Sequence, residues 1–405
     1  MTDAAAVSVT MRGDGRIAAE QRRDAQVLVS PSSRVARDIV ARCGSFAVAL
    51  GSPGSLSSRV MRTLIIGGTG LISTSIAQQL LDRGDAVTVF NRGQTPVRVR
   101  GKLEILTGDR WEPGSLERAV DGRTWDAVID MTAFVPENGD QLVQVFWGRT
   151  AQVVLCSTAC VYGGPAAELP IRETSRRQPF GRYGVNKAAI EERLLDRSGK
   201  DGTVATILRP SFTTGEGATA TGILFDDALV SRMRARLPVI VMDDGRTPWA
   251  IAHVSDVARG FVASLGNARA AGNDYHLTSH EHTDWNGVYR ALAEAAGATA
   301  EIVYVPSEWL RKVAPRRSLG VWFIYRFPSV YDNTKAERDL GFRTTVPLVE
   351  TFRRQLRWMD DTGKLCRVDE APCEDCLIGA WRAGKDRIDD PRWVDENPWG
   401  NNTEN

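Results

Sequence analysis

Thr63-Leu-Ile-Ile-Gly67-Gly-Thr-Gly70-Leu-Ile-Ser73 joins an apolar run, a glycine-rich turn and the first turn of an amphipathic helix. Glycine permits a tight turn and lets backbone N–H groups approach a ligand closely. The N-terminus of the following helix offers unpaired donors and a partial positive charge, which suit a pyrophosphate. The segment therefore predicts a dinucleotide site. Its predicted contacts are Gly67, Thr69, Gly70, Leu71 and Ile72.

The alternation of apolar runs and helical spacing continues after this segment. Strands are predicted over residues 63–66, 86–90, 103–106, 127–131, 152–156 and 204–208. Helices are predicted between them, notably over residues 72–83, 139–147 and 185–197. This order predicts an α/β fold, a doubly wound Rossmann-type parallel sheet with helices on both faces.

The composition changes along the chain and predicts four parts. Residues 1–60 have linker composition, which indicates a disordered leader or a start codon assigned too early, with Met61 as the true start. The other predicted parts are an NAD(P)-binding Rossmann domain over residues 61–210 with a return segment near 249–280, a smaller C-terminal substrate lobe over 211–248 and 281–363, and a polar tail over 364–405.

Charge and hydropathy narrow the possible partners. The 405-residue chain has a formal net charge of +1. Nucleic acids and membrane surfaces attract proteins with a positive field, so neither partner is expected. No apolar run approaches the roughly 20 residues that span a bilayer. The N-terminus also lacks the basic start and apolar block of a secretory signal, so we expect a cytoplasmic protein.

Cysteines and histidines form no complete metal-ligand set in the sequence. Cys373 and Cys376 form a Cys-x-x-Cys pair, but no second pair and no following histidine completes a zinc site. His276, His280 and His282 lie close in sequence without an evident acidic second shell. We therefore expect no metal.

The ends of the second and third strands bear on the choice of cofactor. An NAD enzyme usually has Asp or Glu after the second strand, to hold the ribose hydroxyls. This chain has Asn91 and Arg92 there, and an arginine can pair with a 2′-phosphate. NADP is therefore predicted, with NAD as the alternative. Asp109 follows the third strand, where it can accept from the adenine amino group, and its neighbour Arg110 is included among the predicted cofactor contacts.

Tyr183-Gly-Val-Asn-Lys187 opens a predicted helix after the fifth strand. The tyrosine and lysine side chains lie one helical turn apart on one face. An ammonium beside a phenol favours the phenolate, so the spacing predicts a lowered pKa for Tyr183 and proton exchange with a substrate hydroxyl. A Ser or Thr hydroxyl at the end of the neighbouring strand is suited to orient the substrate oxygen.

These motifs together resemble the extended short-chain dehydrogenases/reductases, the NAD-dependent epimerase/dehydratase group. The resemblance runs from Thr63 to about Asp361. It includes Gly67-Gly-Thr-Gly70, Ser157-Thr-Ala-Cys-Val-Tyr-Gly163, Tyr183-Gly-Val-Asn-Lys187, Leu208-Arg-Pro210, Ala252-His-Val-Ser-Asp256 and Tyr331-Asp-Asn-Thr-Lys335. The resemblance implies hydride transfer on a bound nicotinamide, with Thr158, Tyr183 and Lys187 as the catalytic residues. It also implies a homodimer through the helices near residues 139–147 and 185–197.

Four residues stand where the family usually has substrate contacts. Cys160 matches the position of a catalytic cysteine in some related sugar epimerases, although a small core residue is the simpler interpretation. Phe212 stands where the family often has Asn, and Trp249 stands where it often has an Arg that clamps a diphosphate. Arg246 is the nearby residue that could reach a phosphate instead. The substrate is then either not a nucleotide sugar, or its phosphates are held differently.

Two functions remain open from the sequence. The first is an NAD(P)-dependent epimerase or reductase that acts on a hydroxyl or carbonyl of a small polar substrate, with a nucleotide sugar as one possibility. The alternative is a non-catalytic NAD(P)-binding or RNA-binding protein on the same fold. The intact set of Thr158, Tyr183 and Lys187 favours catalysis.

Overall fold

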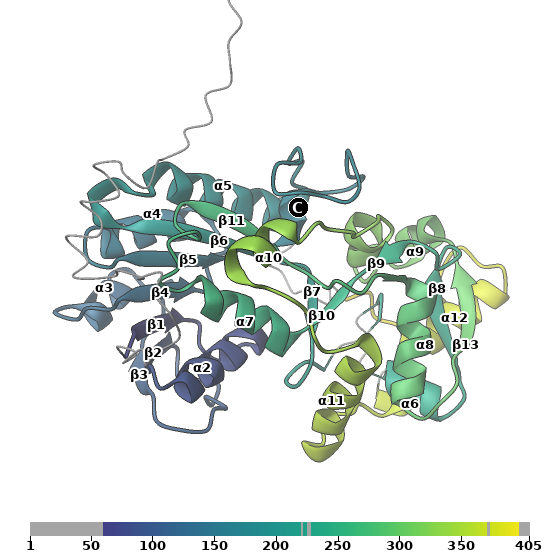
Figure 1. The fold of residues 1–405 in the computed structure, drawn as a ribbon. Helices are drawn as coiled ribbons and strands as arrows, with labels where there is room; N and C mark the ends of the chain where they lie inside the picture. Colours follow the sequence, from purple (N-terminus) through teal and green to yellow (C-terminus); the bar gives the residue numbers. More distant parts are fainter. Residues whose placement is uncertain (1–59, 220–221, 225–227, 371–372, 397–405) are drawn as a thin grey trace, which may run out of the picture. The chain divides into compact units, whose positions relative to one another are not determined.

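A seven-stranded parallel sheet forms the centre of the nucleotide-binding half (Figure 1). The computed structural model describes residues 60–219, 222–224, 228–370 and 373–396, so the predicted leader and the end of the tail lie outside the described residues. The strands are β1 (Arg62–Ile66), β2 (Ala86–Asn91), β3 (Glu104–Thr107), β4 (Ala127–Asp130), β5 (Gln152–Cys156), β6 (Val204–Pro210) and β11 (Asn273–Leu277). Their spatial order is β11-β6-β5-β4-β1-β2-β3.

Helices cover both faces of this sheet, which confirms the predicted doubly wound fold (Figure 1). Successive side chains of a strand point to opposite faces, so Leu64 and Ile66 of β1 pack into one apolar cluster and Ile65 into the other. The first cluster includes α3 (Ser115–Val120), α4 (Pro136–Phe146) and α5 (Gly181–Arg197). The second includes α2 (Leu71–Arg83), α7 (Val254–Ser264) and α10 (Thr334–Leu340).

The C-terminal lobe has its own apolar core. Its strands are the parallel pair β8 (Pro238–Met242) and β13 (Glu301–Val305), the pair β7 (Phe212–Thr214) and β10 (Ile251–His253), and the pair β9 (Pro248–Trp249) and β12 (Thr283–Asp284). Its helices are α6 (Leu229–Arg234), α8 (Trp285–Ala295), α9 (Ser307–Val313), α11 (Leu348–Asp361) and α12 (Cys373–Arg382). The lobe also has the π-helix η3 (Val321–Tyr325) and the short 3₁₀ helix η4 (Val368–Glu370), while the 3₁₀ helices η1 (Ala159–Val161) and η2 (Lys200–Gly202) lie in the nucleotide-binding half.

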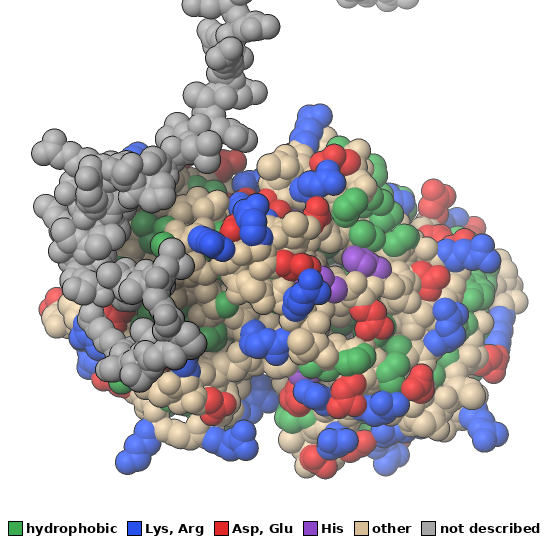
Figure 2. Space-filling view, in the orientation of Figure 1, with side chains coloured by type: hydrophobic (Ala, Val, Ile, Leu, Met, Phe, Trp, Pro, Cys, Tyr) green, Lys and Arg blue, Asp and Glu red, His purple; other side chains and the backbone are tan. Residues whose placement is uncertain are grey.

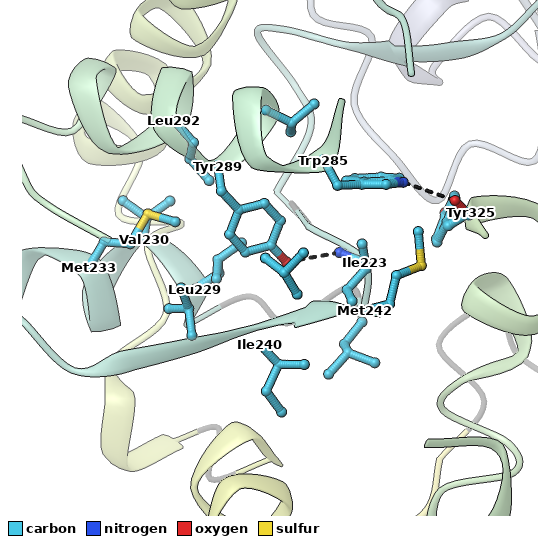
Figure 3. Packing of buried hydrophobic residues seen from close by; sticks show 14 of the residues in the cluster. Ile223, Leu229, Val230, Met233, Ile240, Met242, Trp285, Tyr289, Leu292 and Tyr325 are labelled. Atoms are coloured by element: carbon cyan, nitrogen blue, oxygen red, sulfur yellow. Dashed lines mark hydrogen bonds between the residues drawn. The ribbon is translucent and has the colours of Figure 1, made fainter. Parts of the chain in front are cut away.

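Helix α8 connects the core of the lobe to the segment that carries η3 (Figure 3). The indole nitrogen of Trp285 donates to the Tyr325 carbonyl at 2.9 Å, and the Tyr289 hydroxyl bonds to the Ile223 backbone nitrogen at 3.3 Å. Buried aromatic side chains usually use their polar atom in this way. The first bond holds the η3 segment, which forms one wall of the site described below, and the second joins α8 to Ile223.

Helix α12 lies within the region predicted as a polar tail, and its apolar face joins the core of the lobe. Cys373, Leu377 and Ile378 are buried in that core. Arg232 of α6 also reaches Asp375 of α12 at 2.7 Å. The burial of this helix explains why a segment with many charged residues is ordered against the lobe.

The surface of the chain carries both signs of charge. Basic and acidic side chains are interspersed over the face shown in Figure 2. Among the residues that the structure describes, none of the helices has both the length and the apolar character that a membrane span requires.

Candidate active site

The glycine-rich turn passes closely over the carboxyl edge of the sheet. Gly67 has φ +85°, and a Cβ on it would lie 2.2 Å from the Thr132 methyl group. A Cβ on Gly68 would lie 2.5 Å from Val89. Both positions therefore require glycine. Gly70 is the N-cap of α2, whose first turn has no acidic residue, so the positive end of the helix faces the turn.

The loops after β2 and β3 carry the other predicted cofactor contacts. The Asn91 side-chain oxygen accepts from the Gly93 N–H at 2.7 Å, while its buried amide nitrogen has no partner among the described residues. Arg92 is exposed beside it. The Asp109 carboxylate accepts from the Trp111 N–H at 3.0 Å. A close glycine turn, a helix N-terminus and an unpartnered amide donor fit a dinucleotide, because its phosphates and ribose are acceptors.

Arg110 occupies a different environment from Arg92. Its buried guanidinium pairs with Asp130 of β4 at 2.7 Å. It also donates to the Thr132 hydroxyl at 3.2 Å and to the Gln141 side chain at 3.1 Å. These bonds join the loop after β3 to the end of β4. Arg110 therefore helps to fix Thr132, whose methyl group packs against Gly67 of the glycine-rich turn.

Thr158 and Tyr183, two of the three predicted catalytic residues, line one cavity of about 1090 Å³, and Lys187 is not part of its lining. We call it the active-site cavity, and its lining includes Thr158, Cys160, Phe180, Tyr183, Phe212 and Tyr331. Tyr183 lies in the first turn of α5, and Thr158 follows β5 and caps η1 by accepting from the Cys160 N–H at 3.2 Å. The ammonium of Lys187 is buried, and it donates to the Cys156 carbonyl at 2.7 Å.

The electrostatics of Tyr183 differ from the expectation based on spacing. Burial raises the pKa of the phenol, and the thiols of Cys160 and Cys156 add to that rise, while a hydrogen bond with Thr158 opposes it. Lys187 was expected to lower this pKa. Its ammonium instead lies 5.8 Å from the centre of the Tyr183 ring and is bound to a carbonyl, and burial lowers its own pKa. The phenol is therefore held in its protonated form.

A buried ion network supports the loop that carries Thr158. Arg209 of β6 is fully buried and reaches the Glu191 carboxylate of α5 at 2.6 Å and the Asp274 carboxylate of β11 at 2.7 Å. It also donates to the Tyr162 hydroxyl at 2.7 Å. Glu191 in turn bonds to the Ser157 hydroxyl. One guanidinium thus connects α5, β11 and both ends of the loop from Ser157 to Tyr162.

His276 is part of this network as a neutral ring. Its Nε2 atom lies 2.8 Å from the Tyr162 hydroxyl, and its Nδ1 atom lies 3.1 Å from the Asp332 carbonyl. A carbonyl only accepts, so Nδ1 carries the proton and Nε2 accepts from the tyrosine. Burial and the nearby Arg209 lower the pKa of His276 to about 3.

We expect His276 to stay neutral well below the pH at which an exposed histidine titrates, near 6.5. The unfolded chain binds a proton at this residue near pH 6.5 and the folded chain does not, so its contribution to stability is lost as the pH falls from 6.5 toward 3. NMR spectra of the histidine rings, with His276→Gln to assign the signal, would test this. A midpoint near 6.5 would contradict the neutral assignment.

The four predicted substrate residues lie in different places. Phe212, Cys160 and Trp249 line the active-site cavity. Arg246 is exposed on the turn after β8 and is not among the described lining residues, so the cavity does not include it. Burial raises the pKa of the Cys160 thiol, which disfavours the thiolate that acid–base chemistry at carbon would need.

Several cavity residues were not identified from the sequence pattern. Trp111 and Phe134 follow β3 and β4, and Phe180 precedes α5. They lie in loops, where no periodicity marks a buried or exposed face. Their position after parallel strands is the one signal that could have identified the first two, because the carboxyl ends of such strands meet at one edge.

The histidines and cysteines considered as metal ligands have other surroundings. His280 lies 2.7 Å from the Glu337 carboxylate and 3.0 Å from the Thr344 hydroxyl. Cys373 and Cys376 are buried on α12. Within the described ranges, no group of three or more His, Cys, Asp and Glu side chains is arranged to hold a metal ion.

The chain matches one family model and is similar in sequence to several known proteins. Residues 63–277 match the model of the NAD dependent epimerase/dehydratase family. The chain is 29% identical over 251 residues to 2′-dehydrokanamycin reductase of Streptomyces kanamyceticus, covering 62% of this chain and 70% of that protein. It is 26% identical over 312 residues to chloroplast stem-loop binding protein of 41 kDa b of Arabidopsis thaliana, covering 73% and 78%.

Solved structures give the same fold. The chain resembles the UDP-glucose 4-epimerase of Thermotoga maritima, solved with UDP-glucose, with a TM-score of 0.62 and 20% identity. The match covers 75% of this chain and 99% of that one. At this identity the likeness describes the fold.

Proposed function

Because the chain belongs to the NAD dependent epimerase/dehydratase family, we propose that it is an NADP-dependent reductase in which Tyr183 supplies the proton. The observation that supports this proposal is that Thr158 and Tyr183 line one cavity with Lys187 directly behind it. The glycine turn after β1 ends at the same edge of the sheet. Family membership supports an oxidoreductase or an epimerase, and reduction is proposed because Phe212 and Trp249 line the cavity where related enzymes often have polar nucleotide-sugar contacts.

In the proposed reaction the cofactor supplies the hydride, and residues of the chain bind the substrate and supply the proton. A nicotinamide dinucleotide, when bound, supplies hydride transfer. Thr158 and Tyr183 would hold the substrate oxygen by hydrogen bonds. A phenol with a raised pKa keeps its proton at neutral pH, so it can donate that proton to a carbonyl oxygen that becomes an alcohol. Lys187 would orient the ribose and keep a positive charge behind the phenol.

A ketone panel tests this proposal directly. The purified chain is mixed with NADPH and ketones of different size, and consumption is followed by nicotinamide absorbance. We expect NADPH to be consumed in proportion to alcohol formed. In a parallel assay with NAD⁺ or NADP⁺, interconversion of UDP-glucose and UDP-galactose without net change in nicotinamide absorbance would instead identify an epimerase. Cofactor binding without turnover of any substrate would support the non-catalytic alternative.

The preference for NADP rests on Arg92, which is exposed beside the unpartnered amide of Asn91. Replacement of Arg92 by alanine is expected to weaken the binding of NADP⁺ about tenfold or more, because a charge-assisted hydrogen bond contributes roughly 1.5–3 kcal/mol. The affinity for NAD⁺ should change little, and calorimetric titration measures both.

The control for this titration is Arg100→Ala, because Arg100 is exposed on the same loop. It should leave both affinities near the wild-type values. Equal losses of NADP⁺ and NAD⁺ affinity in Arg92→Ala would remove the basis for the NADP preference.

A homodimer and a cytoplasmic location stay predictions. The dimer would form through α4 and α5, which pack against each other on one face of the sheet. Val185 of α5 is a large apolar residue with 49% exposure, which suits a contact between subunits. Light scattering of the wild type and Val185→Glu would test the interface.

A further inference from the structure

The walls of the active-site cavity are aromatic and partly exposed. Trp111, Phe134 and Phe180 line it, with exposed fractions of 56%, 42% and 38%. The Phe180 ring lies 4.0 Å from the ring of Phe323 in η3, so the two halves of the chain meet at this wall. Large apolar side chains gathered around one cavity and left open to solvent mark a surface that a ligand covers.

Two residues that line the same cavity each have a buried polar atom without a partner in the described part of the chain. These atoms are the indole nitrogen of Trp249 and the hydroxyl of Ser211. The Trp249 ring is 2% exposed and stacks on Trp285 at 4.8 Å, so its orientation is fixed. An indole N–H can only donate, so its missing partner is an acceptor such as a carbonyl or ether oxygen.

The charged residues that line the cavity are all basic. Arg182, Arg311 and Arg316 contribute to the lining, and no Asp or Glu does so among the described residues. Arg182 is exposed and makes no hydrogen bond or ion pair with any described residue. Arg311 donates to the Pro315 carbonyl at 3.0 Å and lies 5.8 Å from the Phe323 ring centre. A guanidinium held only by a carbonyl retains donors for an anion.

From these three features we propose that the active-site cavity takes a bulky, largely apolar ketone or alcohol that carries an anionic group. Its ring system would lie along the aromatic wall, an internal oxygen would accept from Trp249, and its anionic group would reach Arg311. The inference rests on the proposed function, because the reacting carbonyl is placed at Tyr183. A polycation is disfavoured by the three arginines.

Calorimetric titration of the full chain saturated with NADP⁺ tests the inference. The probes are 9-oxoxanthene-2-carboxylate, whose ring ether supplies the internal oxygen, its uncharged 2-carboxamide, UDP-glucose and kanamycin. The carboxylate is expected to bind about tenfold more tightly than the amide, the effect of one charge-assisted contact. UDP-glucose and kanamycin should bind more weakly than either ketone.

Single substitutions test which residues contact the anionic group and the internal oxygen of the ligand. Arg311→Ala should reduce the preference for the carboxylate to about twofold, while Lys312→Ala should retain it, because Lys312 is exposed on the same helix and pairs with Asp386. Trp249→Phe keeps the aromatic surface and removes the donor to the ring ether, so it should weaken the binding of both xanthones equally. Arg311 is partly exposed, so that variant is informative even if Trp249→Phe does not fold.

The possible outcomes separate this inference from the proposed function. Tighter binding of UDP-glucose or kanamycin, or equal binding of carboxylate and amide, would overturn the inference even if NADPH-dependent reduction occurs with another ketone. The predicted ranking of the probes without NADPH consumption by any ketone would support the ligand class and overturn the proposed reductase.

Discussion

Replacement of Tyr183 by phenylalanine is expected to lower kcat about a thousandfold and to leave the affinity for NADP⁺ nearly unchanged. The phenol lies on the active-site cavity together with Thr158, and burial keeps it protonated by raising its pKa. Phenylalanine fills the same volume and removes only the proton donor. Steady-state rates with the best ketone of the panel and calorimetric titration of NADP⁺ measure the two quantities.

Tyr304→Phe is the matched control for this experiment. Tyr304 lies on β13, is 47% exposed, and its hydroxyl donates to the Asn286 side chain at 3.0 Å. Loss of that hydroxyl should leave kcat within about twofold, because a surface substitution away from the site has small effects. An equal kcat in wild type and Tyr183→Phe would assign the proton to another group.

Replacement of Arg209 by methionine is expected to lower the free energy of unfolding by about 3–5 kcal/mol. The side chain is fully buried and its guanidinium contacts both Glu191 and Asp274. Methionine has a similar length, so little space is lost, but the buried carboxylate of Glu191 then lacks its closest cation. Arg177 also reaches Glu191, at 2.9 Å, so the cost is that of a buried carboxylate left with one partly exposed cation, and denaturant unfolding measures it.

Arg234→Met removes a comparable but exposed contact. Arg234 holds Asp360 with two bonds of 2.9 Å, and both side chains face solvent. Exposed ion pairs contribute up to about 1 kcal/mol, so this variant should remain close to the wild type. If both variants lost the same small amount of stability, the network around Arg209 would not be a major support of the site.

The sheet was predictable because its strands are short apolar runs with turn residues between them. The predicted strand over residues 152–156 coincides with β5, and that over 86–90 differs from β2 by one residue. The seventh strand, β11, was not assigned because its alternation is short, with only Tyr275 and Leu277 as apolar residues in Asn273-Asp-Tyr-His-Leu277. Its polar residues are buried through specific partners, such as Arg209 for Asp274, which no periodicity reveals.

The candidate site was partly predictable for a different reason. The spacing of Tyr183 and Lys187 places both on one face of a helix, and the loop after β5 brings Thr158 to the same edge of the sheet. The direction of the Tyr183 pKa was not predictable from that spacing, because it depends on burial and on the carbonyl that holds Lys187. The role of Arg110 in fixing Thr132 likewise depends on its distance from Asp130.

The substrate side of the cavity depends on packing between segments far apart in sequence. Trp249 stacks on Trp285, while Phe180 meets Phe323. Neither pair can be recognised from neighbouring residues in the sequence. The sequence indicated only that Trp249 and Phe212 replace the polar residues that the family often has. The aromatic wall that results is the reason to look beyond nucleotide sugars for the ligand.

A crystal structure of the full chain with NADP⁺ is the most direct test of the central claim, that one bound dinucleotide brings its nicotinamide to Tyr183. We expect the pyrophosphate on the turn from Gly67 to Gly70, and the nicotinamide ring in contact with the Tyr183 hydroxyl and near Thr158. A nucleotide bound elsewhere, or a nicotinamide ring that does not reach Tyr183, would contradict the proposed chemistry.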